Sequence, residues 1–317
     1  MNRASKIVHL DVARKRGLTG KGVGIAIFDT GIGYHPDLFE SKNPGLVAFH
    51  DTTSERKSYY DDNGHGTHVA GIIAGSGKST GGMLQGIAPG CHYVVIKILN
   101  KNGEGNIEHV LLGIRWLLEH WQEYNIRIVN ISVGSAKGKE FGEDSPLVKG
   151  VEKLWNAGLT VLTAAGNHGP SPFSIGAPGN SRKIITVGSS DLIDGPSEAD
   201  YSGRGPTKSC IKKPDIIAPG SNIMSCYPMI PARLSGHYYP LPAKRAFPKL
   251  YNGAPYFARS GTSMATPIVS GCIALLLEQE PGLTNKEIKL RLKDTAKSLG
   301  YSHSRQGWGL IRLDRLL

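Results

Sequence analysis

The chain has 317 residues, of which 39% are hydrophobic, so it can bury a large core, and we expect one α/β domain over residues 1–317. No stretch approaches the roughly 20 consecutive apolar residues that cross a bilayer, which excludes an integral membrane protein. The net charge of +11 indicates a basic surface, but no RNP-like, helix-turn-helix or zinc-finger pattern accompanies it. Nucleic acid is therefore not expected as the main ligand.

Two features of the sequence bear on the compartment. Met1 is followed by residues 2–6 without an apolar run, so no secretory signal is predicted and a cytoplasmic location is expected. Secretion stays open if a leader has been trimmed. Four cysteines without zinc-ligand spacing fit a reducing compartment, and we expect them to be buried as small hydrophobic side chains: Cys91, Cys210, Cys226 and Cys272.

Apolar, β-rich runs alternate with amphipathic helical stretches along the chain. The expected strands are residues 23–28, 93–99, 126–132, 159–164 and 184–187. Helices are expected from His65, over 107–121, from Ser145-Pro146 to Gly158, over 268–277, and from a capping box at Thr284 to Ala296. This alternation predicts a three-layer helix/sheet/helix sandwich with a mostly parallel central sheet, both faces of which are covered.

One long segment, residues 227–257, shows no periodicity and contains six prolines together with several basic and aromatic residues. Long loops of this kind in compact domains are usually functional. Because the segment ends just before Ser263, we interpret it as an insertion loop near the candidate catalytic residues. A surface insertion without function is the alternative.

Polar residues follow three of the predicted strands, at Asp29, at 132–135 and at Gly166-Asn167. In parallel α/β sheets, ligand sites lie at the carboxyl ends of the strands. Asp29 comes directly after a buried strand, where a carboxylate needs a charged or hydrogen-bonding partner. Taken alone, such an aspartate could also be a turn residue or a ribose or Mg²⁺ ligand.

Ser263 and His65 have the properties of a nucleophile and its base. Ser263 precedes a buried helix, where free amides favour developing negative charge, although serine is also a common helix cap. His65 lies between two glycines that leave its imidazole accessible, and histidine is suited to general base catalysis near neutral pH. His68 has no third metal ligand at a suitable spacing, so no metal site is predicted and a packed helix histidine is expected.

Three segments, Asp29-Thr30-Gly31, His65-Gly66-Thr67-His68 and Gly261-Thr262-Ser263-Met264-Ala265, resemble the signature sequences of the subtilisin-like serine proteases, or subtilases. The resemblance runs from Gly20 to the final helix and looks strongest to the intracellular alkaline-protease branch. It implies a subtilisin-like fold and a serine endopeptidase acting on peptides or unfolded proteins through an acyl-enzyme.

Carried over to this chain, the resemblance implies that Asp29 orients His65, that His65 acts as general base and then acid, and that Ser263 attacks the scissile carbonyl. Asn167 matches the asparagine of the oxyanion hole, the group of donors that stabilises the tetrahedral intermediate. The order Asp, His, Ser contradicts an α/β-hydrolase esterase, in which the serine comes first. A peptide-binding pseudoprotease would have lost a triad residue, and none is missing.

The resemblance also implies where substrate binds. Peptide would pair with the edges at 102–105 and 132–135. Small residues would wall a roomy primary pocket that prefers large hydrophobic side chains before the scissile bond: Ser132, Val133, Gly134, Ala164, Ala165 and Gly166. Ile107, Val110 and Val133 match a secondary hydrophobic pocket, although each could equally belong to the core.

The sequence departs from the family pattern in three ways. Ser135 stands where glycine is usual, which would make the pocket entrance narrower or more polar. The family's calcium loop is replaced by residues 75–82, which carry a lysine and no carboxylate, so only Asp37 remains of its usual ligands. We therefore expect no required cofactor, with weaker structural calcium sites left open. We expect no inhibitory prodomain within these residues, with a trimmed mature form as the alternative, and the oligomeric state stays open.

Overall fold

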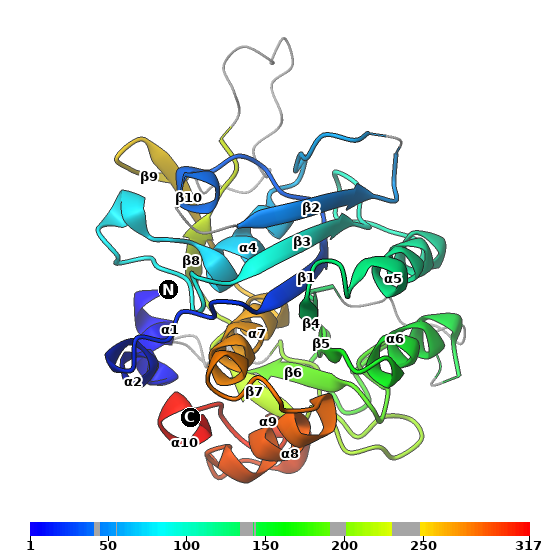
Figure 1. The fold of residues 1–317 in the computed structure, drawn as a ribbon. Coiled ribbons are helices and arrows are strands. Elements are labelled where there is room, and N and C mark those ends of the chain that lie inside the picture. The colour runs from blue at the N-terminus through cyan, green and yellow to red at the C-terminus, as the bar shows by residue number, and fades with distance from the viewer. Residues whose placement is uncertain (41–44, 55, 134–141, 143, 191–200, 230–247) are drawn as a thin grey trace.

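The computed structural model describes the whole chain except residues 41–44, 55, 134–141, 143, 191–200 and 230–247 (Figure 1). A seven-stranded sheet lies at its centre, in the order β2-β3-β1-β4-β5-β6-β7. All neighbouring strands in it are parallel. Its strands are β1 Gly24–Asp29, β2 Leu46–Asp51, β3 His92–Lys97, β4 Ile126–Ile131, β5 Thr160–Ala164, β6 Ile185–Ser189 and β7 Ile216–Ala218.

Helices cover both faces of the sheet, as the apolar strands require. Helices α4 (His65–Ala74) and α7 (Thr262–Gln279) pack against each other and against the strands, while α5 (Ile107–His120) and α6 (Pro146–Asn156) pair on the opposite side (Figure 1). Every residue of β1 and β5 is buried between these layers. The predicted three-layer sandwich with a mostly parallel sheet is confirmed.

Short helices complete the fold near the termini and at the edges of the layers. Helix α10 packs against α2, and the amide of Leu313 donates to the carbonyl of Val8, so the two ends of the chain meet. These helices are α1 Asn2–Ile7, α2 Leu10–Lys15, α3 Pro36–Phe39, η1 Lys78–Thr80, α8 Asn285–Thr295, α9 His303–Gln306 and α10 Leu313–Leu316. Among the described helices, none is long and apolar enough to cross a bilayer.

The predicted helix starts are confirmed by their caps. The Asn106 side chain accepts from an amide of the first turn of α5, and Ser145 does the same for α6, with Pro146 in the first position. At α8, Thr284 and Glu287 form both bonds of a capping box. In each case a local side-chain acceptor satisfies amides that the helix itself leaves unpaired.

A second, antiparallel sheet corrects the expectation that 227–257 is an unstructured loop. It has the order β8-β10-β9, with β8 at Ile223–Cys226, β9 at Lys249–Tyr251 and β10 at Ala254–Arg259. The tight turn between β9 and β10 is Asn252-Gly253, both with positive φ, which is the usual sequence of a two-residue hairpin. That signal was present in the sequence, but the surrounding prolines hide it. Residues 230–247 of the segment lie outside the described residues.

The cysteines divide into two groups. Cys91, Cys226 and Cys272 are buried as predicted, whereas Cys210 is exposed, and all four are free thiols. The prediction is wrong for Cys210 because this residue closes a surface turn, in which its amide donates to the carbonyl of Thr207 and its φ is 60°.

Candidate active site

The carboxyl end of β1 lies where the order of the sheet reverses. After β1 the chain builds β2 and β3 on one side, and then crosses to β4 on the other. Such a reversal opens a crevice beyond the strand ends. Asp29, the last residue of β1, is therefore at the position where the topology favours a site.

Asp29 and His65 are joined by a short hydrogen bond of 2.7 Å between Asp29 Oδ1 and His65 Nδ1. The same carboxylate oxygen accepts the amide of Thr30 at 2.8 Å. Because an ionised carboxylate only accepts, this bond favours the tautomer in which Nδ1 carries the proton and Nε2 is left as an acceptor. The aspartate side chain is fully buried and that of His65 is 18% exposed, so the imidazole bridges the interior and the solvent.

One carboxylate fixes the start of α4. The oxygens of Asp61 accept bonds from the hydroxyls of Thr30 and Thr67 and from the amides of Asn63, Gly64 and Thr67. Thr30 follows Asp29 directly, so this network ties the end of β1 to the first turn of the helix that carries His65.

Gly66 lets α4 approach β1 closely. Its amide donates to the Thr30 hydroxyl at 2.9 Å, and a Cβ at this position would lie 2.1 Å from the carbonyl oxygen of Gly31. The glycine next to His65 therefore has a packing role in addition to the predicted one of leaving the imidazole accessible.

Lys97 is a buried lysine beneath the site that the sequence interpretation missed. Its ammonium donates to the carbonyls of Thr30 at 2.6 Å and Leu99 at 2.7 Å, and to Asp62 Oδ1 at 2.7 Å. All three donors are thus satisfied, and the charge is paired. The signal available in the sequence was a lysine at the end of an otherwise apolar strand.

Ser263 lies at the first turn of α7, directly after the cap residue Gly261 and Thr262, and it is partly buried. Helix α7 packs against α4, which brings the serine and histidine segments together. Within the described residues, no hydrogen bond joins the Ser263 hydroxyl to His65. Catalytic hydrogen bonds often form fully only when substrate is bound.

Asn167 lies after β5, and its side chain is held by the first residue of α7. Its Oδ1 accepts the amide of Thr262 at 2.9 Å and the Thr262 hydroxyl at 3.1 Å. Because Oδ1 is occupied, Nδ2 is the end that remains able to donate to a ligand. A Cβ at Gly261 would lie 3.2 Å from that Nδ2, so the donor faces the serine segment.

The residues predicted to line substrate pockets have different environments. Ala164 and Ala165 are buried and Gly166 is partly exposed, at the end of β5. Ser132 is fully buried, and its hydroxyl accepts Asn130 Nδ2 at 2.8 Å, so its side chain anchors the strand.

The remaining pocket predictions are divided in the same way. Val133 is partly buried against the core, Ile107 is partly exposed at the first position of α5, and Val110 belongs to the core. Gly134 and Ser135 lie outside the described residues.

His68 is a structural histidine, as expected. It is fully buried, and its Nε2 lies 2.9 Å from the carbonyl oxygen of Ile223 and 3.0 Å from that of Phe257. Burial lowers the pKa of this imidazole well below its usual value, so the ring is neutral and donates from Nε2. It joins α4 to β8 and β10, which places the second sheet directly beside the histidine helix.

The surroundings of Asp37 do not fit calcium. Asp37 Oδ1 accepts the amide and the hydroxyl of Ser79, both at 2.9 Å, and Oδ2 accepts the Tyr256 hydroxyl. The nearest other metal-ligating groups are an imidazole and a thiol, from His35 and Cys226, whereas calcium prefers several oxygens. The His35 nitrogens are themselves occupied, by the Asp37 amide and the Pro255 carbonyl.

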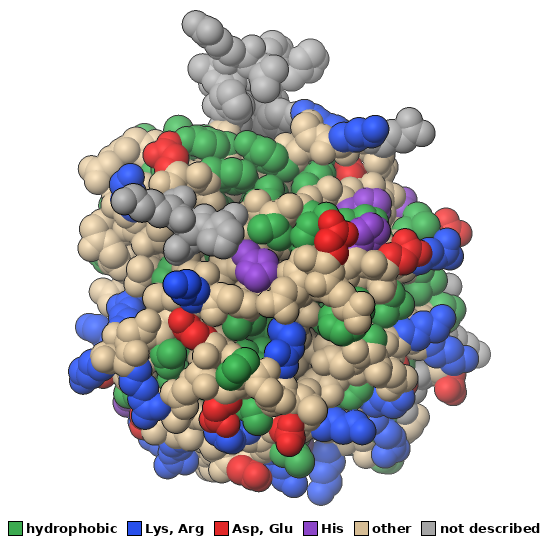
Figure 2. Space-filling model, viewed as in Figure 1, with side chains coloured by type: hydrophobic (Ala, Val, Ile, Leu, Met, Phe, Trp, Pro, Cys, Tyr) green, Lys and Arg blue, Asp and Glu red, His purple; other side chains and the backbone are tan. Residues whose placement is uncertain are grey.

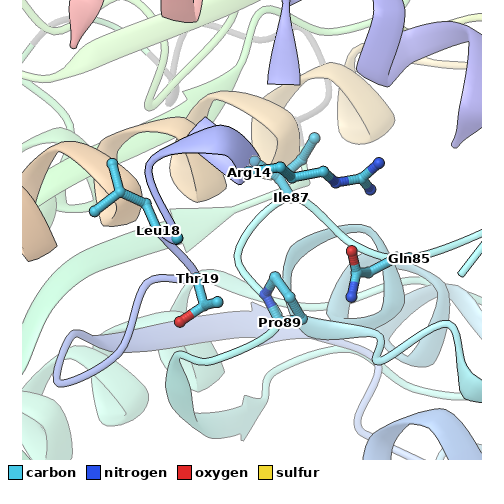
Figure 3. A pocket seen from close by; sticks show the side chains of 7 residues that line it. Arg14, Leu18, Thr19, Gln85, Ile87 and Pro89 are labelled. Atoms are coloured by element: carbon cyan, nitrogen blue, oxygen red, sulfur yellow. The ribbon is translucent and has the colours of Figure 1, made fainter. Parts of the chain in front are cut away.

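A small cavity of about 120 Å³ lies elsewhere (Figure 3). Arg14, Leu18, Thr19, Gln85, Ile87 and Pro89 surround it. These residues precede the amino ends of β1 and β3, whereas Asp29 and Lys97 end those strands. The cavity therefore lies near the amino ends of these strands, whereas the Asp29–His65 pair lies at their carboxyl ends.

The surface of the molecule is unevenly charged. In the view of Figure 2, Lys and Arg side chains are spread mainly over the lower half and the rim, interspersed with Asp and Glu, and the middle is mostly uncharged. An excess of basic groups, with a net charge of +11, gives a field that attracts anions over distances of about a Debye length, and it identifies no particular ligand.

Comparison with known proteins gives consistent matches over nearly the whole chain. The Subtilase family matches residues 20–309. Serine protease AprX of Bacillus subtilis (strain 168) is 42% identical over 286 residues, covering 87% of this chain and 62% of AprX. Subtilisin BL of Lederbergia lenta is 33% identical over 307 residues, covering 97% of this chain and 95% of that protein. This chain thus spans less than two thirds of AprX.

Solved structures give the same result for the fold. Sphericase superposes with a TM-score of 0.71 at 28% identity, covering 93% of this chain and 92% of that one. A cold adapted subtilisin-like serine proteinase gives a TM-score of 0.68 at 27% identity, with 93% and 90% covered. The predicted subtilisin-like architecture is confirmed.

Proposed function

Since the chain belongs to the subtilase family, whose members include serine proteases, we propose that it is a serine endopeptidase with Asp29, His65 and Ser263 as its catalytic triad. The observation that carries the proposal is the 2.7 Å bond from His65 Nδ1 to the buried Asp29 carboxylate, at the reversal point of the sheet. Ser263 lies in the first turn of the helix packed against α4, which supports its role as nucleophile.

The chemistry follows from the protonation state of His65. Nε2 accepts the Ser263 proton as Oγ attacks the scissile carbonyl, and it later gives that proton to the leaving amine. Asp29 holds the ring in this tautomer and stabilises the imidazolium that forms. Burial of the carboxylate strengthens that stabilisation, because the surrounding dielectric is low and water does not compete for the oxygen.

Asn167 is proposed as the side-chain donor of the oxyanion hole. Its oxygen is bound to Thr262, which fixes the amide and leaves Nδ2 and the Ser263 amide to donate to the developing oxyanion. The donor is therefore positioned before substrate arrives.

We propose peptides and unfolded protein segments as substrates, with a preference for large hydrophobic residues before the scissile bond. The small side chains of Ala164 and Ala165 at the end of β5 support a roomy, apolar pocket. The preference is measured as kcat/KM on peptides that differ only in this residue. Phenylalanine and leucine are expected to exceed glycine, and equal rates would contradict the pocket.

Labelling with a fluorophosphonate probe, followed by mass spectrometry, tests the nucleophile. Native protein is expected to carry one adduct on Ser263, and Ser263→Ala none. Ser209→Ala is the matched control, because this serine is exposed and far along the chain from the family motifs, so its loss should leave labelling unchanged. An unlabelled native protein would contradict the proposal and favour a peptide-binding pseudoprotease.

A further inference from the structure

Arg259 is a charged residue close to the candidate active site that the catalytic mechanism does not use. It ends β10, four residues before Ser263. Its Nη2 lies 3.4 Å from the carbonyl oxygen of Asn63, two residues before His65, and this is a long, weak hydrogen bond. Its Nε is buried and has no partner in the part of the chain that the structure describes. The guanidinium is therefore poorly satisfied.

An aromatic pair lies on one side of this guanidinium. Arg259 Cζ lies 5.6 Å from the centre of the Phe257 ring, and the Phe257 and Tyr227 rings are 5.7 Å apart. Tyr227 in turn contacts the backbone before His65, because a Cβ on Gly64 would lie 2.9 Å from its Cε2. These two rings therefore extend from Arg259 to the backbone that directly precedes His65.

No carboxylate of the described chain neutralises Arg259 by direct contact. The closest acidic influences are Asp61 and Asp29, and neither forms an ion pair with it among the described residues. Asp61 already accepts five hydrogen bonds, and Asp29 Oδ1 is committed to Thr30 and His65. Burial lowers the pKa of the guanidinium, but arginine remains charged under all ordinary conditions.

A partly desolvated arginine with unused donors has the chemistry to bind a carboxylate. Leaving such a group without a partner is costly, and a planar fork of N–H donors matches the two oxygens of a carboxylate. Arg259 is also partly exposed, so a ligand at the surface can reach its guanidinium.

We propose that Arg259 binds a carboxylate of the peptide substrate close to the scissile bond, so that the enzyme favours acidic substrates. The inference rests on the proposed function, since it assumes that peptides bind beside His65 and Ser263. An aspartate or glutamate side chain and a free chain end offer the same chemistry.

The test uses internally quenched peptides that keep leucine before the scissile bond and carry a single glutamate or glutamine. The position of this residue is moved through two places on each side of the bond, and each peptide is made with a free and an amidated end. In the native enzyme we expect kcat/KM for glutamate to exceed that for glutamine by about ten- to hundredfold at one position, the range of a charge-assisted hydrogen bond. A preference for free over amidated ends instead would assign the carboxylate to the chain end.

Variants assign the preference to Arg259. Arg259→Gln is expected to bring the ratio of glutamate to glutamine close to one, and Arg259→Lys to retain part of it, because lysine keeps the charge without the fork. Arg182→Gln is the matched control: this exposed arginine precedes the amino end of β6, and its loss removes the same charge far from the crevice. The control should keep the native ratio.

Fluorophosphonate labelling separates failure of this inference from failure of the proposed function. If Ser263 is labelled and glutamine peptides are cleaved, but no position and no chain end shows a carboxylate preference, the inference is wrong. If Ser263 is unlabelled and no peptide is cleaved, the proposed function itself is wrong. Should Arg259→Gln fail to fold, the native preference and its partial retention in Arg259→Lys decide the matter.

Discussion

At the residue scale, two side-chain oxygens, one of Asp29 and one of Asn167, each accept two hydrogen bonds that orient the candidate site. Asp29 Oδ1 accepts both the Thr30 amide and His65 Nδ1, and Asn167 Oδ1 accepts two donors of Thr262. In each residue, one end of the side chain is bound to the scaffold so that another group has a defined orientation for chemistry. Replacement of either residue should therefore affect catalysis more than stability.

We predict that Asn167→Ala lowers kcat by about a hundred- to a thousandfold and changes KM little, the loss typical of one oxyanion-hole donor and a value that comes from a subtilisin. Asn167→Asp should lose as much, because it keeps the acceptor for Thr262 but places an oxygen where the donor was. His168→Ala, an exposed neighbour, is the control. Steady-state kinetics of all three variants check the prediction, and a native kcat in Asn167→Ala would remove Asn167 from the oxyanion hole.

Lys97→Met is predicted to destabilise the protein by about 3 kcal/mol, since it breaks a buried ion pair and leaves two carbonyls without their donor. Urea unfolding in the Ser263→Ala background, which prevents self-digestion, measures the effect. The exposed Lys101→Met should change stability by less than about 0.5 kcal/mol. Equal stabilities of the two variants would show that the Lys97 network contributes nothing net.

A functional residue can be predicted from the sequence when the residues next to it in the chain form a distinctive segment. It is missed when its role depends on contacts with residues far away in the sequence. Asp29 and His65 stand in distinctive segments, and the structure joins them. Lys97 looks like any strand lysine until Asp62 and the carbonyl of Thr30 are placed beside it. Arg259 is likewise unremarkable in sequence, because its relation to Asn63 spans 196 positions.

At the scale of elements, hydrogen bonds join α3, η1 and the second sheet where relatives are expected to bind calcium. The Asp37 carboxylate of α3 accepts hydrogen bonds from Ser79 of η1 and from the Tyr256 hydroxyl of β10. Asn252 of the hairpin turn donates to the Ser79 carbonyl at 2.8 Å. Protein donors thus surround the carboxylate that would otherwise face a cation.

We predict that a chelator leaves the melting temperature of the Ser263→Ala protein unchanged, because these contacts need no metal. Ser79→Ala, which removes one hydroxyl donor to Asp37, should lower stability by about 1 kcal/mol. Ser76→Ala is the control, since its hydroxyl makes only a long 3.4 Å contact with the Lys78 amide. Calorimetry with and without EDTA provides the measurement, and a clear drop in melting temperature with EDTA would reveal a bound structural cation.

The long strands and helices could be predicted from continuous apolar runs and from capping residues. The short or half-exposed strands have no such pattern and were missed. The continuous apolar runs predict β1, β3, β4, β5 and β6, and the capping residues predict the starts of α5, α6 and α8. Strand β2 is half exposed at the edge of the sheet and β7 has only three residues, so neither gives a distinct pattern. The second sheet depends on pairing between β8 and β10, which are separated in sequence by residues 227–253.

For the whole molecule, the net charge of +11 includes positive groups that are buried, and Lys213 is one of them. Lys213 donates to Asp215 Oδ2 at 2.5 Å and to the carbonyl of Ile184 at 2.9 Å, and Asp215 also accepts the amide of Thr186. This cluster ties the segment before β7 to β6. Burial outweighs the attraction of Asp215 and lowers the pKa of Lys213 from 10.5 to about 8.

The lowered pKa of Lys213 predicts that its contribution to stability increases at alkaline pH. The folded protein releases the lysine proton near pH 8, whereas the unfolded chain holds it to about 10.5, so the unfolded state binds more protons between these values. The free energy of unfolding should therefore rise through this window, by up to about 3 kcal/mol from this group. Below pH 8 the full cost of burying the charge is present.

Urea unfolding at pH 7.5, 9 and 10.5 in the Ser263→Ala background measures this rise. Adding Lys213→Met should abolish the rise in unfolding free energy, because methionine does not titrate. Lys212→Met changes an exposed neighbour and should keep the rise. This control accounts for the other groups that titrate in the same range. Curves for the two variants that run parallel across the window would mean that Lys213 keeps its proton when folded, and that the bond to Asp215 dominates over burial.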